Sequence, residues 1–255
     1  MKVSAPVRPY YSAKGASTAF YDLVTAKDAS LSGDIDLYAS LAPAGGSILE
    51  LGAGTGRVAV ALAEQGFHVT GLDIAPAMLD QANAKRASCS DEVASRLHFV
   101  QGDMTSFTLA KQFDAVICTF YALAHLPVGA AWTNTFKAVG RHLKPGGTAA
   151  FHLPVPAKMG STVPPPTSPV FNYSTGDGES LTLFVAKRTM TDRVGRMDLI
   201  LRYVHAGPKG VQESLERLTL YSGDPDLFAV ASGFDRLGEP VALGEDGLVH
   251  IYKRT

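Results

Sequence analysis

Three closely spaced glycines follow an apolar run near the start of this sequence. Residues 48–57 read I-L-E-L-G-A-G-T-G-R, with glycines at positions 52, 54 and 56 immediately before a helical pattern. Glycines in such a loop allow a tight turn and a close approach of the backbone to a ligand. The third glycine comes one residue earlier than in the G-x-G-x-x-G dinucleotide fingerprint. The loop therefore predicts a nucleotide-type ligand but does not specify a dinucleotide.

A carboxylate precedes this loop and bears on the ligand's charge. Glu50 lies two residues before Gly52, at the end of the apolar run. A pyrophosphate is stabilised by an exposed helix N-terminus, and a neighbouring carboxylate would repel it. The same carboxylate suits a cationic amine. The local charge thus favours an amino-acid-like group over a pyrophosphate.

Two further acidic residues follow strand-like runs. Asp73 ends the run at 67–73, 17 residues after Gly56, where a carboxylate can accept hydrogen bonds from both ribose hydroxyls. The alternative role for a lone Asp at a strand end is a cap or turn former. Asp103 and Met104 follow the run at 97–101, where Asp103 is placed to meet an adenine amino group and Met104 to pack on the ring.

These side chains need a scaffold that brings several strand ends together. Short apolar runs predict strands at residues 47–51, 67–73, 97–101, 113–119 and 148–153. Helical patterns lie between them at 57–66, 76–87 (with Pro76 in the first turn) and 132–143. The alternation predicts a doubly wound, mostly parallel α/β sheet, which binds ligands at the carboxyl ends of its strands.

The rest of the chain predicts two additions to this sheet. Helices at 17–24 and 33–41 make residues 1–45 an N-terminal helical lid. Residues 154–169 hold six of the fifteen prolines and predict a loop, followed by strands at 180–187, 196–205 and 213–221. Residues 154–222 are therefore predicted as an antiparallel insertion over the substrate pocket. A helix at 224–232 and strands at 234–242 and 248–253 return the chain to the main domain, residues 46–153 and 223–255.

The five elements together resemble the class I S-adenosylmethionine-dependent methyltransferases. These are the glycine loop, Asp73, Gln101-Gly102-Asp103-Met104, the run at 113–119 leading into Phe120-Tyr121, and Lys144-Pro145-Gly146-Gly147. Their order and spacing match over residues 46–153. The resemblance implies a Rossmann-like sheet of seven strands, with the closing strand antiparallel, and S-adenosylmethionine as cofactor with S-adenosylhomocysteine as product.

The resemblance also implies a place for each cofactor residue. Glu50 would lie near the methionine amine, and Asp73 would hold the ribose. The loop Gly52, Ala53, Gly54 and Gly56 would form the floor of the site. Ile74, Asp103 and Met104 would surround the adenine, and the backbone at Thr119 and Phe120 would meet the methionine part.

Four further cofactor candidates each have a second interpretation. Arg57 is a candidate for the cofactor carboxylate or an exposed first-turn residue. Met78 is a candidate for the cofactor wall or the core. Tyr11 and Tyr21 would close over the sulfonium through cation–π contact, or would only pack a terminal helix.

The acceptor side resembles small-molecule N-methyltransferases of the aminosugar and glycine types. His125, just past the fourth strand, is the candidate catalytic residue, because a histidine with an ordinary pKa near 6.5 can help to deprotonate an amine. A backbone-satisfied histidine at a helix start is the alternative. The substrate-binding candidates are Tyr121, His125, His152, Arg202 and Tyr203.

Composition excludes several other classes of protein. A net charge of −1 argues against a nucleic-acid partner, and two cysteines cannot build a disulfide framework or a four-thiolate zinc site. No run of residues has metal-ligand spacing, and no apolar stretch reaches membrane-spanning length. We expect a cytoplasmic enzyme for a small molecule. The alternatives are an O- or C-methyltransferase and a non-catalytic subunit that binds the cofactor.

Overall fold

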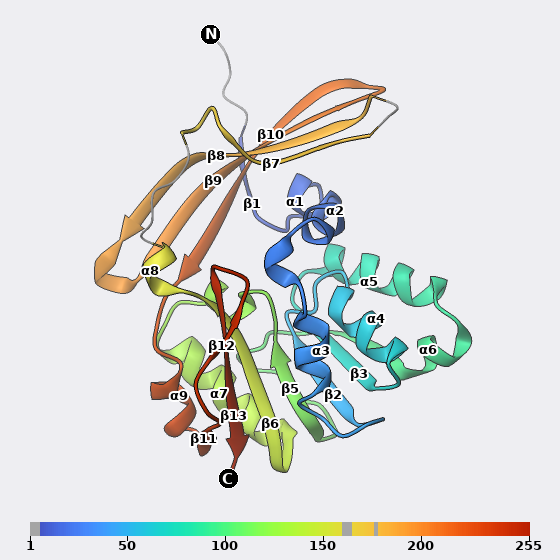
Figure 1. The fold of residues 1–255 in the computed structure, drawn as a ribbon, viewed down its shortest axis with the longest axis vertical. Coiled ribbons are helices and arrows are strands. Elements are labelled where there is room, and N and C mark those ends of the chain that lie inside the picture. The colour runs from blue at the N-terminus through green and yellow to red at the C-terminus, as the bar shows by residue number, and fades with distance from the viewer. Residues whose placement is uncertain (1–5, 160–164, 176–177) are drawn as a thin grey trace.

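The chain folds into two β-sheets with the N-terminal helices between them (Figure 1). The structure is a computed structural model that describes residues 6–159, 165–175 and 178–255. Parts of three predicted segments lie outside the described residues. They are residues 1–5 of the lid, 160–164 of the proline-rich loop and 176–177 of the insertion.

The main sheet confirms the predicted doubly wound architecture. Its strand order is β11-β13-β6-β5-β2-β3-β4, and the short β12 pairs with β13 as an eighth strand. The strands from β2 to β6 are parallel, whereas β13 is antiparallel to β6. The bounds are β2 (Ser47–Leu51), β3 (His68–Asp73), β4 (Leu97–Gln101), β5 (Phe113–Cys118), β6 (Leu143–Pro154), β11 (Phe234–Arg236), β12 (Val241–Leu243) and β13 (Gly247–Arg254).

Two apolar cores, one on each face of this sheet, explain its continuous apolar runs. Leu49 and Leu51 of β2 pack with Trp132 and Phe136 in one core, whereas Ile48 packs with Leu62 in the other. Because both faces are buried, alternation of apolar and polar residues is absent from the strand. The helices are α3 (Asp34–Ala39), α4 (Arg57–Glu64), α5 (Pro76–Ser88), α6 (Asp91–Arg96), α7 (Ala130–His142) and α9 (Asp226–Val230).

The second sheet holds the inserted strands and also a short strand from the N-terminal segment. Its order is β1-β10-β9-β8-β7, with β1 parallel to β10 and the other pairs antiparallel. The bounds are β1 (Val7–Pro9), β7 (Pro169–Ser174), β8 (Ser180–Thr191), β9 (Arg196–Gly207) and β10 (Gly210–Tyr221), with η3 (Asp192–Val194) between β8 and β9. The three strands predicted in the insertion are present and extend further.

The prediction of a loop over residues 154–169 is wrong at both ends. A single turn of helix, α8 (Pro156–Met159), begins at a proline, which lacks only an N–H that a first helical residue does not need. Strand β7 begins at Pro169 and lies at the edge of its sheet, where a missing ladder donor is tolerated.

The strand predicted at 234–242 is also wrong, because it is two strands. Both β11 and β12 pair with β13, and the chain between them contains Gly238 at φ +68° and Pro240. A left-handed glycine turns the chain and a proline cannot donate to the ladder, so the pairing breaks there.

The N-terminal segment is more broken than the single helix predicted at 17–24. It consists of α1 (Ala16–Ala19), α2 (Tyr21–Ala26) and the 3₁₀ turn η1 (Ala29–Leu31). Phe20 separates α1 from α2 with φ −113° and ψ 12°, outside helical geometry. Both helices lie between the inserted sheet and the main domain (Figure 1).

Candidate active site

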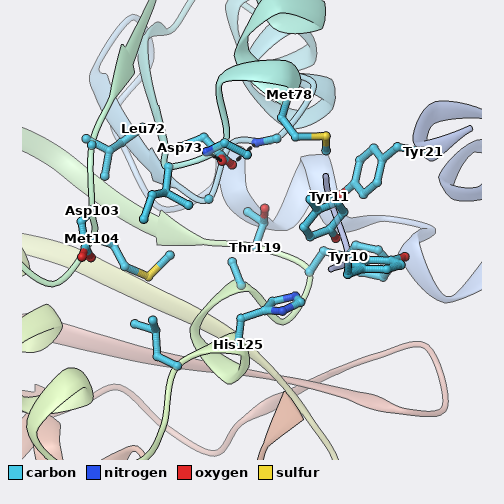
Figure 2. A pocket seen from close by; sticks show the side chains of 18 residues that line it. Tyr10, Tyr11, Tyr21, Leu72, Asp73, Met78, Asp103, Met104, Thr119 and His125 are labelled. Carbon is cyan, nitrogen blue, oxygen red and sulfur yellow. Dashed lines mark hydrogen bonds between the residues drawn. The ribbon is translucent and has the colours of Figure 1, made fainter. Parts of the chain in front are cut away.

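A cavity of about 290 Å³ lies where the carboxyl ends of the parallel strands meet the N-terminal segment (Figure 2). Ligands of doubly wound sheets bind at this edge. Its wall is formed by Tyr10, Tyr11, Tyr21, Gly52, Gly54, Leu72, Asp73, Ile74, Ala75, Met78, Gly102, Asp103, Met104, Thr119, Phe120, Ala122, His125 and Leu126. Most of the predicted cofactor residues therefore share one cavity.

The three glycines of the loop have different surroundings. Gly52, Gly54 and Gly56 all have positive φ, at +71°, +54° and +76°. Gly52 and Gly54 line the cavity, whereas Gly56 and Ala53 do not. A Cβ at Gly56 would lie 2.7 Å from Cζ of Phe99, so this glycine permits the packing of α4 on β4.

Asp73 is held by two backbone amides with its carboxylate on the cavity wall. Gly54 N donates to Oδ2 at 2.7 Å, and Ala75 N donates to Oδ1 at 2.8 Å. Burial raises the pKa of Asp73, and these N–H donors oppose the rise. Each carboxylate oxygen retains acceptor capacity. The arrangement suits a ligand with two neighbouring hydroxyls.

Glu50 is fully buried behind the cavity wall. Thr119 Oγ1 donates to Oε1 of Glu50 at 2.9 Å, and Oε2 has no hydrogen-bond partner among the described residues. Burial raises the pKa of Glu50 to about 8, against the opposing hydrogen bond from Thr119. A buried carboxylate oxygen without a partner is costly, so this group is suited to a cationic ligand.

The cavity has an apolar end near Ile74, Asp103 and Met104. Ile74 is 65% exposed and lies on the cavity wall, where its apolar surface can meet a flat ring. The carboxylate of Asp103 accepts a hydrogen bond from Thr105 N at 2.8 Å and lies at the wall. Met78 is buried and also lines the cavity, so it contributes to both the core and the cavity wall.

The opposite end of the cavity is aromatic (Figure 2). The Tyr11 ring centroid lies 5.8 Å from that of Tyr21 and 5.7 Å from that of His125, and Tyr21 lies 6.5 Å from Phe120. Tyr10 also lines this end and is not among the residues predicted from the sequence. Its position next to Tyr11 was the only available signal.

Backbone strain concentrates at the same end. Tyr11, Phe120 and Tyr121 are the non-glycine residues of the described chain with positive φ, at +59°, +41° and +63°. Such conformations cost about 1–3 kcal/mol each and persist where the surrounding structure imposes them, often at functional sites.

His125 reaches the cavity from the 3₁₀ turn η2 (Ala122–His125). Burial lowers the pKa of His125 to about 4, so its imidazole is neutral at pH 7. Its ring therefore has a free lone pair at neutral pH. A group with this pKa is a weak base, and its contribution rests on position as much as on basicity.

His152 and Tyr121 lie beside the cavity, outside its wall. Their ring centroids are 4.7 Å apart, and His152 is 1% exposed. Neither ring nitrogen of His152 has a hydrogen-bond partner among the described residues, and burial lowers its pKa to about 4. The pair forms a second polar group adjoining the aromatic end.

Three other predicted residues are not on the cavity wall. Arg57 forms an ion pair with Asp34, so its guanidinium is already committed. Arg202 lies over the ring of Phe184 at 4.1 Å and faces Glu213 at 3.7 Å. Tyr203 is buried, and its hydroxyl meets that of Tyr10 at 3.5 Å. Sequence spacing cannot show these partners, because each lies outside the element that carries the residue it contacts.

Comparison with known proteins identifies the family. Residues 48–147 match the family described as "Methyltransferase domain". The cypemycin N-terminal methyltransferase of Streptomyces is 30% identical over 189 residues, covering 70% of this chain and 69% of that protein. This chain belongs to the S-adenosylmethionine-dependent methyltransferases. The predicted family and the predicted cofactor, S-adenosylmethionine, are thereby confirmed.

Two further matches to methyltransferases differ in how much they cover. YqeM of Bacillus subtilis is 37% identical over 126 residues, and the chain spans about half (49%) of its length. The structure of the sugar N-methyltransferase KedS8 from Streptoalloteichus has a TM-score of 0.72 at 19% identity, covering 100% of this chain and 99% of that one. The second match shows that the fold is shared along the full length of the two chains.

The described residues lack two other kinds of feature. No helix among them has the length and apolar character needed to cross a membrane. Within the same residues, no group of three or more His, Cys, Asp or Glu side chains is arranged to hold a metal ion.

Proposed function

We propose that this methyltransferase transfers a methyl group from S-adenosylmethionine to a nitrogen of a small molecule. One observation carries the proposal: a single cavity has an amide-anchored Asp73 on its wall, an aromatic end that contains His125, and Thr119, whose hydroxyl connects the wall to the buried Glu50 behind it. A ribose, an ammonium and a sulfonium each have a matching group there. The proposed places are Asp73 for the ribose, Ile74, Asp103 and Met104 for the adenine, and Glu50 with Thr119 for the methionine end.

The chain's part in the reaction is mainly positioning. S-adenosylmethionine supplies an already activated methyl group when it is bound. The protein must hold a nucleophile in line with that methyl at about 3–3.5 Å and exclude water. Tyr11, Tyr21 and Phe120 are proposed to close the aromatic end, and the neutral His125 to take up or orient the acceptor's proton.

Nitrogen as the acceptor is supported by what the relatives are named for. KedS8 is named as a sugar N-methyltransferase, and the cypemycin enzyme is named for methylation at an N-terminus, where a peptide carries its amine. The net charge of −1 supports a small molecule over a nucleic acid. Tyr121 and His152 are proposed to face the acceptor beside His125. Arg202 and Tyr203 are proposed to belong to the inserted sheet that roofs it, and residues 1–45 to act as the lid.

Isothermal calorimetry with S-adenosylmethionine tests the cofactor part of the proposal. The wild type should bind, and Asp73→Ala should weaken binding about 10- to 100-fold, because hydrogen bonds to a charged group contribute about 1.5–3 kcal/mol. The exposed Asp235→Ala is the matched control and should bind like the wild type. No binding by the wild type would contradict the proposal.

A product screen tests the acceptor part. Pools of amines, phenols and heterocycles are incubated with the enzyme and S-adenosylmethionine, and products one methyl group heavier are sought by mass spectrometry. Methylated amines are the expected products. Methylated phenols or carbon centres would favour the O- or C-methyltransferase alternative, and binding without any product would favour a non-catalytic subunit.

A further inference from the structure

Glu216 is a completely buried carboxylate in the inserted sheet. It lies on β10 and has 0% exposed surface. Its Oε1 accepts hydrogen bonds from Ala16 N and from Ser17 N, the latter at 3.2 Å, and its Oε2 lies 3.3 Å from Ser17 N. The partners are backbone amides of the N-terminal segment, about 200 residues away in sequence.

The N-terminal loop is built around this carboxylate. A Cβ added at Gly15 would lie 3.0 Å from Oε1 of Glu216 and 2.9 Å from Oγ of Ser12. The absence of a side chain at Gly15 therefore lets the loop approach the carboxylate closely. Strand β1 runs parallel to β10, and Tyr10 N donates to the carbonyl oxygen of Arg217 at 3.0 Å. Residues 10–17 are therefore fixed to the inserted sheet at both ends.

A short chain of contacts leads from Glu216 to the cavity. Glu216 holds the amide of Ser17, and the Oγ of the same serine accepts a hydrogen bond from Tyr11 N at 2.9 Å. Tyr11 has φ +59°, an unfavourable conformation for a tyrosine that needs support from its surroundings. Its ring then faces His125 across the aromatic end (Figure 2).

We infer that Glu216 is a positioning residue that sets the Tyr11 ring against the sulfonium of the bound cofactor. The inference rests on the proposed function, because it takes S-adenosylmethionine as the ligand of the cavity. It also explains why a carboxylate is buried in the inserted sheet. Through Glu216, that sheet contributes to the cofactor site as well as covering the acceptor.

The neighbouring helix α2 is anchored separately, which makes the effect of Glu216 separable. Asp22 Oδ1 accepts hydrogen bonds from Thr55 Oγ1 at 2.6 Å and from Lys85 Nζ at 2.7 Å, which tie α2 to the main domain. A change at Glu216 should therefore loosen residues 10–17 and Tyr11 while Tyr21 stays in place.

Calorimetric affinities for two ligands test the inference. S-adenosylmethionine carries the positive sulfonium and S-adenosylhomocysteine does not. In Glu216→Gln the negative charge is lost and one acceptor oxygen becomes an NH2 donor, which weakens the hold on the amides of Ala16 and Ser17. We therefore expect the preference for S-adenosylmethionine over S-adenosylhomocysteine to fall about 3- to 30-fold, the range of a cation–π contact. Glu213→Gln, on the same strand with a 57% exposed side chain, should leave this preference unchanged.

Two further variants link the effect to Tyr11. Tyr11→Leu should show the same loss of preference for S-adenosylmethionine. Combining Tyr11→Leu with Glu216→Gln should add little to this loss, since both variants remove the same interaction. Ser17→Ala removes the hydroxyl that links Tyr11 to the segment held by Glu216. This variant tests the same inference if Glu216→Gln does not fold. It should lower the same preference.

The outcomes separate this inference from the proposed function. A wild type that binds neither ligand would overturn the proposed function. A wild type that binds both, with Glu216→Gln or Ser17→Ala altering thermal stability but not the preference, would overturn only the role of Glu216 and leave it a structural residue.

Discussion

At the scale of single residues, burial decides the charge state of the groups in this site. Glu50 and His125 are ordinary residue types whose pKa values move in opposite directions, up to about 8 and down to about 4, because burial disfavours the charged form of each. Both groups are therefore neutral at pH 7 before a ligand is bound. A cationic ligand beside Glu50 would favour the charged form of its carboxyl group instead.

The affinity for S-adenosylmethionine should consequently rise with pH. Below about pH 8 the free Glu50 is protonated, and pairing with an ammonium releases this proton, so affinity should rise up to about tenfold per pH unit between pH 6 and pH 8. Calorimetry of the wild type and Glu50→Gln across this range is the measurement. Protonation of the ligand itself affects the wild type and Glu50→Gln equally. A ratio of their two Kd values that stays constant across this pH range would therefore contradict the pairing of Glu50 with the ammonium.

The stability of the free protein gives the same test without ligand. The pKa of Glu50 is higher folded than unfolded, so the folded state holds more protons between about pH 4.5 and pH 8. The contribution of Glu50 to the free energy of unfolding should therefore fall as pH rises through this window. Glu50→Gln should lack that decline in urea denaturation.

Replacing His125 should affect turnover more than cofactor binding. His125→Asn keeps a polar group in η2 but removes the imidazole, and we expect kcat for the true acceptor to fall about 100-fold. The Kd for S-adenosylmethionine should change little. His98→Asn, on the exposed side of β4, is the control. Unchanged kcat and KM in His125→Asn would exclude a role in the reaction.

At the scale of elements, one loop combines two tasks that the sequence does not separate. Gly52 and Gly54 face the cavity, whereas Gly56 faces Phe99 and lets α4 pack on the sheet. All three share the positive φ that the loop requires. Spacing alone predicted the loop, but only the packing around it distinguishes the glycines.

Alanine at two of these positions should therefore have different effects. Gly56→Ala places a Cβ 2.7 Å from Phe99 Cζ at φ +76° and should cost about 2–4 kcal/mol of the free energy of unfolding. Gly54→Ala, whose Cβ would face Met78 Cε at 3.3 Å, should cost about 1 kcal/mol from φ and mainly weaken cofactor binding. Urea denaturation and calorimetry measure the two effects. Equal losses of stability would contradict this division.

The elements that sequence reasoning missed share a physical cause. Strands β1 and β7 are short or proline-bounded, and they exist because an edge of the second sheet offers them a partner. The apolar residues at 241–243 continue the strand pattern past the turn, so the pattern predicts one strand where β11 and β12 are separate. The interiors of helices and strands follow from local sequence pattern, whereas short edge strands and strand ends depend on their tertiary partners.

At the scale of the whole molecule, the N-terminal segment joins the two sheets. Glu216 fixes residues 10–17 to the inserted sheet, and Asp22 fixes α2 to Thr55 and Lys85 of the main domain. The cavity is enclosed between these two attachments. Its integrity is therefore a property of the complete fold.

The stability of the fold should fall in mild acid for a related reason. Burial lowers the pKa of His125 and His152 to about 4, so the unfolded chain holds more protons than the folded one between about pH 4 and pH 6.5. Each histidine should remove about 1.4 kcal/mol of stability per pH unit as pH falls through this window. Urea denaturation should show a shallower decline in His125→Asn and His152→Asn than in His98→Asn, and three equal slopes would contradict buried neutral histidines.

The sequence by itself determined the family, the parallel sheet and the residues at the strand ends. Strand runs, the glycine spacing and Asp73 and Asp103 are local patterns, and parallel topology brings strand ends to one edge without further information. Only the tertiary structure decided that Arg57 pairs with Asp34, that Tyr10 joins the cavity and that Glu216 supports Tyr11. Those contacts join residues far apart in the chain, and their energies arise from burial, which no local pattern encodes.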